Sequence, residues 1–298
     1  MIYHSDNRVT IRDITDIEEL RHLEQMQADV WGITDRSEIV PKDILKIIQV
    51  NGGLVLGAYD QNQQILGFLF GFLGIRADGQ LKHCSHMMGI LPKYRASGIG
   101  LRLKLAQRSF VLKQGINLIT WTVNPLEGAN AAINFGKLGV VCRNYLPNFY
   151  GEMEDSLNKG FPSHRFEVEW WIRSPRVEEF IRLAEGGNRI RHEITAQDIR
   201  MNQISTEGKI IELLSLNQIA NQTGKLVYEV PMDFQGIKDN DLNIAKELLE
   251  HDRAFFMEAV AQGYVVADFM TQVVEGERRN YYLLERNLEN ILNRSFFG

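Results

Sequence analysis

The stretch that decides the fold reads His86-Met-Met-Gly-Ile-Leu-Pro-Lys-Tyr-Arg-Ala-Ser-Gly-Ile-Gly100 and continues as Leu-Arg-Leu-Lys-Leu-Ala-Gln-Arg-Ser-Phe-Val-Leu-Lys113. An apolar run ends at Pro92 and is followed by a basic turn that contains glycines. From Gly100 onward the apolar residues recur at helical spacing. The pattern therefore predicts a strand over residues 83–91, a turn, and a helix over residues 101–114.

The start of that helix is predicted to bind an anion. The N–H groups of a first helical turn have no partner within the helix, and they lie at the positive end of the helix dipole. Glycines in the turn let the backbone approach a phosphate closely because no Cβ intervenes, and an arginine adds a fork of donors. The predicted phosphate-binding turn comprises Arg95, Ala96, Ser97, Gly98, Ile99 and Gly100.

The charge around this turn supports a phosphate ligand over an ordinary tight turn. No acidic residue occurs between Asp78 and Glu127, whereas the chain as a whole has a net charge of -5. Seven basic residues lie in that interval: Lys82, Lys93, Arg95, Arg102, Lys104, Arg108 and Lys113. A merely solvated helix face would usually carry both signs. Acidic residues outnumber basic ones over residues 176–298, which argues against nucleic acid as the main partner.

The spacing Arg95-x-x-Gly98-x-Gly100 after a strand and a proline resembles the pyrophosphate-binding signature of the GNAT N-acetyltransferase superfamily, where it holds coenzyme A. The run Phe135-Gly-Lys-Leu-Gly139 is similar to a second run of that family. The likeness covers residues 9 to about 173, and further short runs resemble a little-described bacterial subgroup. It implies a mixed α/β sheet, an acyl-CoA co-substrate and, from the subgroup runs, Asn130 as a further coenzyme-binding residue.

The predicted domain organisation is an α/β, GNAT-like domain over residues 1–175 and a smaller α+β domain of unknown role over residues 176–298. Ser174-Pro-Arg176 is the predicted boundary. Strands are expected at residues 9–11, 54–59, 65–73, 83–91, 116–123, 140–145, 164–172, 209–216, 225–231, 264–270 and 280–284. Helices are expected at residues 15–30, 42–50, 101–114, 129–138, 177–184, 239–262 and 286–297.

Acyl transfer from a thioester needs a donor that polarises the carbonyl, a base and an acid. The backbone around Met88 and Gly89 is the predicted donor, with a strand bulge that Gly89 would tolerate. Together with Ile90 these residues would bind the pantetheine arm, because the open edge of residues 87–91 offers backbone hydrogen bonds of the strand-addition kind.

His86 is the predicted base, because a histidine near neutral pKa suits the task. It shares its strand with His83 and Ser85, and a structural histidine is an equally good interpretation of the residue. Glu127 is a second candidate base, although a carboxylate there also fits the start of a helix. No metal is expected, since the His83-Cys84-x-His86 run has no fourth ligand cluster beyond it.

Tyr145 and Tyr150 are the candidate acids that would protonate the departing thiolate. The tyrosine that often has this role in the family aligns with Phe135, which has no proton to give. Trp121 is expected to pack in the core. His251-Asp252-Arg253, on the predicted long helix, is expected at the surface because neighbours on a helix do not face one another.

The sequence thus predicts an enzyme, an acyltransferase that moves an acyl group, most simply acetyl from acetyl-CoA, to an amine by direct attack. The alternative is a catalytically silent acyl-CoA-binding sensor or assembly module, which is considered because Phe135 occupies the position of the family's tyrosine. A P-loop is the weaker third interpretation, because its lysine-serine signature is missing. Two cysteines, no signal peptide and no long apolar run predict a cytoplasmic protein that does not enter membranes, and a homodimer is left open.

Overall fold

The computed structural model describes residues 2–5, 9–151, 160–190, 192–219 and 224–294. These residues form two compact units. The first comprises the described residues up to Trp121 together with Gly160, and the second comprises residues 122–151 and 161–294. The predicted domain boundary at residues 174–176 therefore falls inside the second unit. Independent folding of residues 1–175 and 176–298 stays a prediction.

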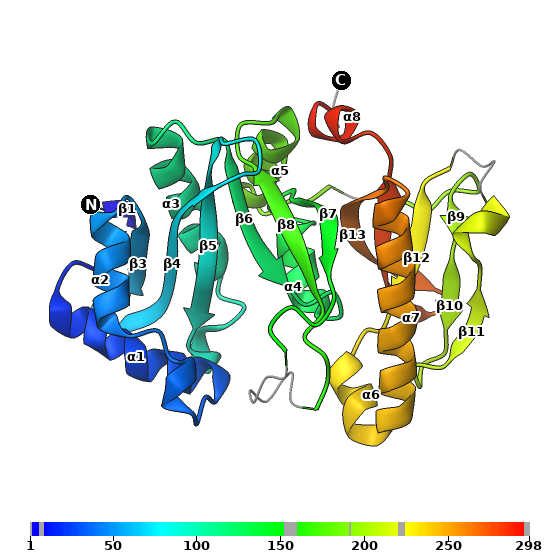
Figure 1. The fold of residues 1–298 in the computed structure, drawn as a ribbon, viewed down its shortest axis with the longest axis horizontal. Helices are drawn as coiled ribbons and strands as arrows, with labels where there is room; N and C mark the ends of the chain where they lie inside the picture. Colours follow the sequence, from blue (N-terminus) through cyan, green and yellow to red (C-terminus); the bar gives the residue numbers. More distant parts are fainter. Residues whose placement is uncertain (1, 6–8, 152–159, 191, 220–223, 295–298) are drawn as a thin grey trace. The chain divides into compact units, whose positions relative to one another are not determined.

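The first unit is built on six neighbouring strands in the order β1-β2-β3-β4-β5-β6. Their bounds are Ile2–Ser5, Thr10–Asp13, Leu54–Tyr59, Ile65–Ile75, Leu81–Ile90 and Leu118–Val123, the last of which reaches the border of the unit. Neighbours pair antiparallel except β5 and β6, which are parallel. The predicted order of strand, two helices, three strands, basic helix and strand is confirmed, and only β1 was missed (Figure 1).

Helices cover both faces of this sheet. The helices of the first unit are α1 (Ile17–Trp31), α2 (Lys42–Val50) and α3 (Ile99–Lys113). Successive residues of β3 face opposite sides of the sheet. Val55 packs with α1 and α2, whereas Leu54 packs with α3. Because both faces are covered, every residue of β3 is buried. Short 3-10 turns lie at Arg36–Glu38 and Pro92–Tyr94.

Local capping signals explain why these helices begin and end where they do. The predicted bounds of α2 are confirmed, with Pro41 as the N-cap. The N-cap of α1 is Asp16, whose side chain accepts from two backbone amides, so the predicted capping box at Thr15 was wrong by one residue. Gly32 ends α1 at φ 68°, a left-handed conformation that glycine adopts at little cost.

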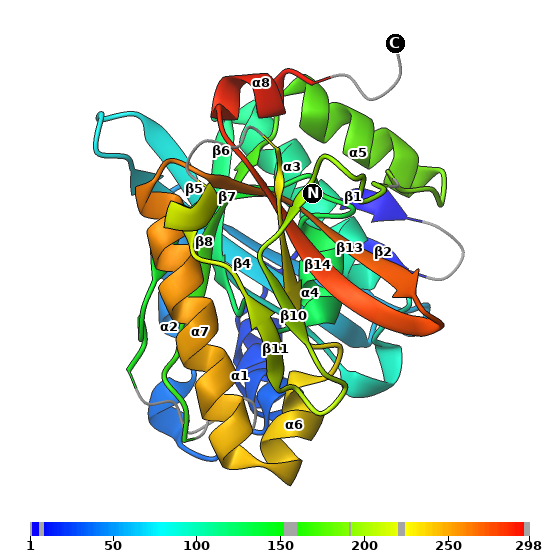
Figure 2. The ribbon, with the colours of Figure 1, turned by 90° about the vertical axis from the view of Figure 1, so that its right-hand side faces the viewer.

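The second unit has six strands in the order β8-β7-β13-β14-β12-β9 and a separate pair, β10-β11. Figure 2 labels the neighbouring strands β13 and β14 and the pair β10-β11. In chain order their bounds are Val141–Leu146 (β7), Arg165–Trp171 (β8), Ile199–Arg200 (β9), Asn202–Ile204 (β10), Ile210–Leu213 (β11), Leu226–Val230 (β12), Val265–Val274 (β13) and Glu277–Glu285 (β14). The described part of residues 176–298 thus holds more strands than the three or four that were predicted. The short strands β9 and β10 gave no periodic signal, because two or three residues cannot show one.

The helices of the second unit are α4 (Gly128–Asn134), α5 (Pro175–Glu185), α6 (Phe234–Asn240), α7 (Leu242–Ala261) and α8 (Leu288–Leu292), with a 3-10 turn at Leu216–Ile219. The predicted helix over residues 239–262 is interrupted at Asp241, which is extended (φ -149°, ψ 101°) and caps α7 through its side chain. The predicted helix over residues 286–297 is shorter than expected, and its last three residues lie outside the described ranges. No described helix is both long enough and apolar enough to cross a membrane.

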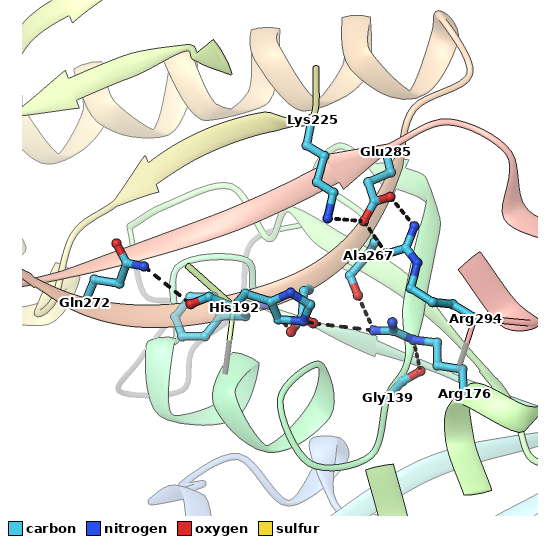
Figure 3. A network of polar contacts seen from close by, with 10 residues as sticks. Gly139, Arg176, His192, Lys225, Ala267, Gln272, Glu285 and Arg294 are labelled. Carbon is cyan, nitrogen blue, oxygen red and sulfur yellow. Dashed lines mark hydrogen bonds and ion pairs between the residues drawn. The ribbon is translucent and has the colours of Figure 1, made fainter. Parts of the chain in front are cut away.

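Arg176 explains why the second unit continues through the predicted boundary. Its guanidinium is 1% exposed and donates to the backbone oxygens of Gly139, at 3.0 Å, and Ala267 (Figure 3). It also lies 3.8 Å from a carboxylate oxygen of Asp268. A Ser-Pro pair is typical of linkers, but here it forms the N-terminus of α5, with Ser174 as the cap.

Candidate functional site

The predicted strand, turn and helix are present as β5, the 3-10 turn Pro92–Tyr94 and α3. Gly98 is the N-cap of α3 at φ 85°, and a Cβ there would meet no atom within 4 Å. Gly100 is held more closely, because its Cβ would lie 3.2 Å from the Cδ1 atom of Ile90. The left-handed backbone at position 98 therefore favours glycine, and a Cβ at position 100 would press on the side chain of Ile90.

The amides at the start of α3 have no hydrogen-bond partner among the described residues. Within the described part of the chain, no side chain caps this helix and no backbone oxygen accepts from the N–H groups of Ile99, Gly100 or Leu101. The first turn of α3 contains no acidic residue. Residues 95–98 are exposed, whereas Ile99 and Gly100 are buried. An uncapped N-terminus of a 15-residue helix with cations beside it favours a bound anion.

The other residues of the predicted turn set its backbone conformation or form hydrogen bonds within the protein. Ala96 has φ 60°, which is uncommon for alanine. The Ser97 hydroxyl donates to the backbone oxygen of Tyr94 at 2.6 Å. The Nη2 atom of Arg95 donates to the Val30 oxygen at the end of α1, at 2.9 Å, so the predicted arginine fork is partly used within the protein.

An open strand edge lies beside this turn. β5 pairs with β6 only through His83 and Cys84, so among the described strands residues 85–90 have no partner on the β6 side. Met88 and Ile90 lie on this free stretch and pack towards α3. The predicted free edge for the pantetheine arm is thus present within the first unit.

The strand bulge lies at His86, not at Met88 and Gly89 as predicted. Phe70 of β4 pairs with Met87 and Gly71 pairs with Ser85, which leaves His86 as the extra residue. Gly89 has another reason to be glycine, because a Cβ there would lie 2.8 Å from the ring of Phe68. A bulge position follows from the register of the partner strand, which one strand's sequence does not contain.

The bulge directs the His86 ring between two aromatic rings. Its centroid lies 5.3 Å from that of Phe70 and 6.0 Å from that of Phe72. Desolvation by these neighbours lowers the pKa of His86 below its ordinary value. His86 is nevertheless exposed, so a neutral, accessible imidazole lies at the bulge, two residues beyond the last pair that β5 forms with β6.

The predicted acids and Asn130 lie in the second unit. Tyr145 is buried and stacks on Phe256, at 6.0 Å between centroids. Tyr150 is 46% exposed, and its hydroxyl is 2.8 Å from the Oγ1 atom of Thr122. Asn130 donates to a carboxylate oxygen of Glu127 at 3.4 Å. The roles of Tyr145, Tyr150 and Asn130 in chemistry or coenzyme binding stay predictions.

Phe135 is buried in the second unit against Tyr282, with ring centroids 5.5 Å apart. It therefore has a packing role in the core, in addition to lacking a proton to donate. No described group of three or more His, Cys, Asp and Glu side chains is arranged to hold a metal ion.

One cluster near the open edge was not predicted. Lys104, counted in the sequence among the basic residues around the phosphate turn, is 2% exposed and bonds to Ser85 and Gln107. A cation in a helix with other cations looks like a surface residue. The burial of Lys104 depends on its contacts with β5 and β6, which its own helix sequence does not contain.

Solved structures of N-acetyltransferases are similar to this chain. A ribosomal-protein alanine N-acetyltransferase from Escherichia coli is 15% identical over 55% of this chain and 94% of its own, with a TM-score of 0.41. Naa50 from Arabidopsis thaliana, solved with a bisubstrate analogue that contains CoA, is 19% identical over 54% and 97%, with a TM-score of 0.43. A protein from Desulfovibrio desulfuricans described as an acetyltransferase of the GNAT family is 13% identical over 55% and 99%, with a TM-score of 0.42.

One of these three structures is described as a member of the GNAT family, the family that the sequence resembles. At identities below 20% and TM-scores below 0.5, the likeness assigns neither a reaction nor an acceptor. No protein-family model matches the sequence, and no curated protein sequence matches it.

Proposed function

We propose that the first unit binds an acyl-CoA thioester, most simply acetyl-CoA, and transfers the acyl group to an amine. The observation that carries this proposal is the N-terminus of α3, which no side chain caps and whose first turn holds no acidic residue, beside the free edge of β5. The amides fit a diphosphate. The free edge fits the amide-containing arm of coenzyme A.

Phosphate contacts alone would not hold the ligand firmly. Charge-assisted hydrogen bonds contribute roughly 1.5–3 kcal/mol each, and micromolar affinity requires about 8 kcal/mol after the costs of ordering. Three such bonds are therefore marginal, and backbone bonds along residues 87–90 would supply the remainder. This arrangement would bring the thioester towards the bulge, where His86 is assigned as the group that takes up the amine proton.

Binding of coenzyme A to the Gly98→Glu variant tests the phosphate site. The new carboxylate would repel a diphosphate and could itself cap the free amides, so we expect affinity to fall at least about tenfold, or about 1.4 kcal/mol. Titration calorimetry with coenzyme A measures the change. Pantetheine, which lacks the phosphates, should bind both proteins equally weakly.

Gly115→Glu is the matched control. Gly115 follows the other end of α3 at φ 76°, also with no atom within 4 Å of its Cβ position, so the variant carries a similar backbone strain and the same charge. We expect its affinity to match that of the unchanged protein. Equal affinity in all three proteins would contradict the phosphate site.

Release of free thiol from acetyl-CoA with a panel of primary amines separates the enzyme from the silent sensor. The panel would contain a polyamine, a free amino acid and a peptide with a free N-terminus. Amine-dependent thiol release is the expected result. Binding without release across the panel would favour the sensor.

A further inference from the structure

A cavity of about 330 Å³ lies within the second unit. Its walls come from the end of β10 and the turn that follows, the end of β12 and the turn that follows, α6, and the start of β14. The cavity contains none of the residues that were predicted to bind coenzyme A or to act in acyl transfer. Its volume falls in the range of small-molecule sites, so its lining indicates what kind of molecule it suits.

One part of the cavity wall is apolar. Ile204, Val230 and Pro231 are buried there, and Ile237 of α6 is half-buried. Met232, in the turn after β12, is 45% exposed although it is a large apolar side chain. A ligand with an apolar body would remove part of this surface from water, which favours binding.

Another part of the wall is charged, and most of its charge is compensated within the protein. The Nη1 atom of Arg279 donates to a carboxylate oxygen of Glu229 and to the backbone oxygen of Ile204, both at 2.9 Å. Its Nη2 atom donates to Glu277 at 3.0 Å. Asn202 fixes the backbone at Glu229 through two hydrogen bonds of 2.8 and 2.7 Å. These groups form a fixed wall that needs no ligand to balance it.

Two charged groups that line the cavity lie outside this network. Arg278 is exposed, and its guanidinium has no hydrogen bond or ion pair with any described residue. Asp233 caps α6 through its Oδ1 atom, which accepts from the Gly236 amide at 2.9 Å, whereas no described residue donates to its Oδ2 atom. The cavity therefore offers one unused guanidinium and one unused carboxylate oxygen beside an apolar wall.

We propose that this cavity binds an α-amino acid with an apolar side chain. The ligand carboxylate pairs with Arg278, because a guanidinium fork suits a carboxylate. The ligand ammonium pairs with Asp233, and the side chain lies against Met232 and Ile237. A ligand with a single charge would cover either Arg278 or Asp233 without giving it a partner, which costs binding free energy. This site concerns the second unit alone and does not depend on acyl transfer.

Titration calorimetry on the full chain tests the site, with L-leucine, L-methionine and L-phenylalanine as the probes. We expect saturable binding of at least one of them, with one site per chain. For the tightest binder, the analogue without the carboxylate and the analogue without the amine should each bind at least about tenfold more weakly, because each lacks one charge-assisted contact. Glycine, which has both charges and no side chain, should also bind more weakly.

Arg278→Gln tests the carboxylate contact. We expect it to weaken binding of the amino acid at least about tenfold. Binding of the analogue without the carboxylate should not change, because that analogue has nothing to pair with Arg278. Arg182→Gln is the matched control, since Arg182 is an exposed arginine of the same unit that does not line the cavity, and it should bind as the unchanged protein does.

Met232→Gln tests the apolar contact, because it keeps the length of the side chain and makes it polar. We expect weaker binding of the amino acid, whereas Met257→Gln, at a methionine of α7 that is 40% exposed and outside the cavity, should leave the affinity unchanged. Absence of saturable binding of all three amino acids would overturn the inference. So would an amine analogue that binds as tightly as its amino acid, or equal affinities of Arg278→Gln and Arg182→Gln.

Discussion

Replacing Arg176 with alanine is expected to lower the free energy of unfolding of the second unit by about 3–5 kcal/mol. The guanidinium is buried, and it donates to the backbone oxygens of Gly139 and Ala267 (Figure 3). It also lies 3.8 Å from a carboxylate oxygen of Asp268. The substitution would leave two buried carbonyl oxygens without these donors and would remove a counter-charge from a buried carboxylate. Chemical denaturation followed by tryptophan fluorescence measures the change.

Arg182→Ala is the matched control on the same helix. The Arg182 side chain is 66% exposed, and its pair with Glu179 is of the i,i+3 surface kind, which contributes about 0–1 kcal/mol. We expect at most a small change in the free energy of unfolding. A loss for Arg176→Ala no larger than that for Arg182→Ala would show that the buried network does not stabilise the unit.

The part of the fold that could be predicted from the sequence is the part that short-range signals determine. The turn after Pro92 and the N-terminus of α3 follow from residues next to one another in the chain, so local patterns predict the turn and place the helix start within two residues, at Leu101 instead of Ile99. The same holds for α2, whose start at Pro41 and end at Asn51 are local events. Pairing partners, by contrast, are not local, and the bulge at His86 was misplaced for that reason.

The burial of three charged residues was not predicted from the sequence. Lys104 is one of several cations, Arg176 follows a Ser-Pro pair, and Asp252 stands between two charged or polar neighbours, so each has the local surroundings of a surface residue. In the structure all three are at least nine-tenths buried. Their burial depends on elements far away in the chain, and a helix residue between two exposed neighbours can face the interior.

Asp252 is therefore expected to make the stability of the second unit depend on pH. Its side chain is 2% exposed, its Oδ1 atom accepts from the Tyr228 hydroxyl at 2.7 Å, and its Oδ2 atom has no partner among the described residues. Burial raises the pKa of Asp252 to about 7. Other titratable groups near this carboxyl are the hydroxyls of Tyr145 and Tyr282.

The sign of the effect follows from the direction of that shift. Between about pH 4, where an aspartate of an unfolded chain titrates, and about pH 7 the folded chain binds the proton that the unfolded chain has lost. Stability from this group is thus complete at low pH and declines as the pH rises through that interval. A shift of about three units corresponds to about 4 kcal/mol.

Asp252→Asn keeps an oxygen for the Tyr228 hydroxyl and cannot ionise, so its free energy of unfolding should lack this decline. We expect the difference in unfolding free energy between the variant and the unchanged protein to move in favour of the variant by up to about 4 kcal/mol from pH 4 to pH 8. Denaturation at several pH values measures it. Glu258→Gln changes an exposed carboxylate of the same helix, so its unfolding free energy should depend on pH as that of the unchanged protein does. The same pH dependence for Asp252→Asn would show that Asp252 ionises as freely in the folded chain as in the unfolded chain.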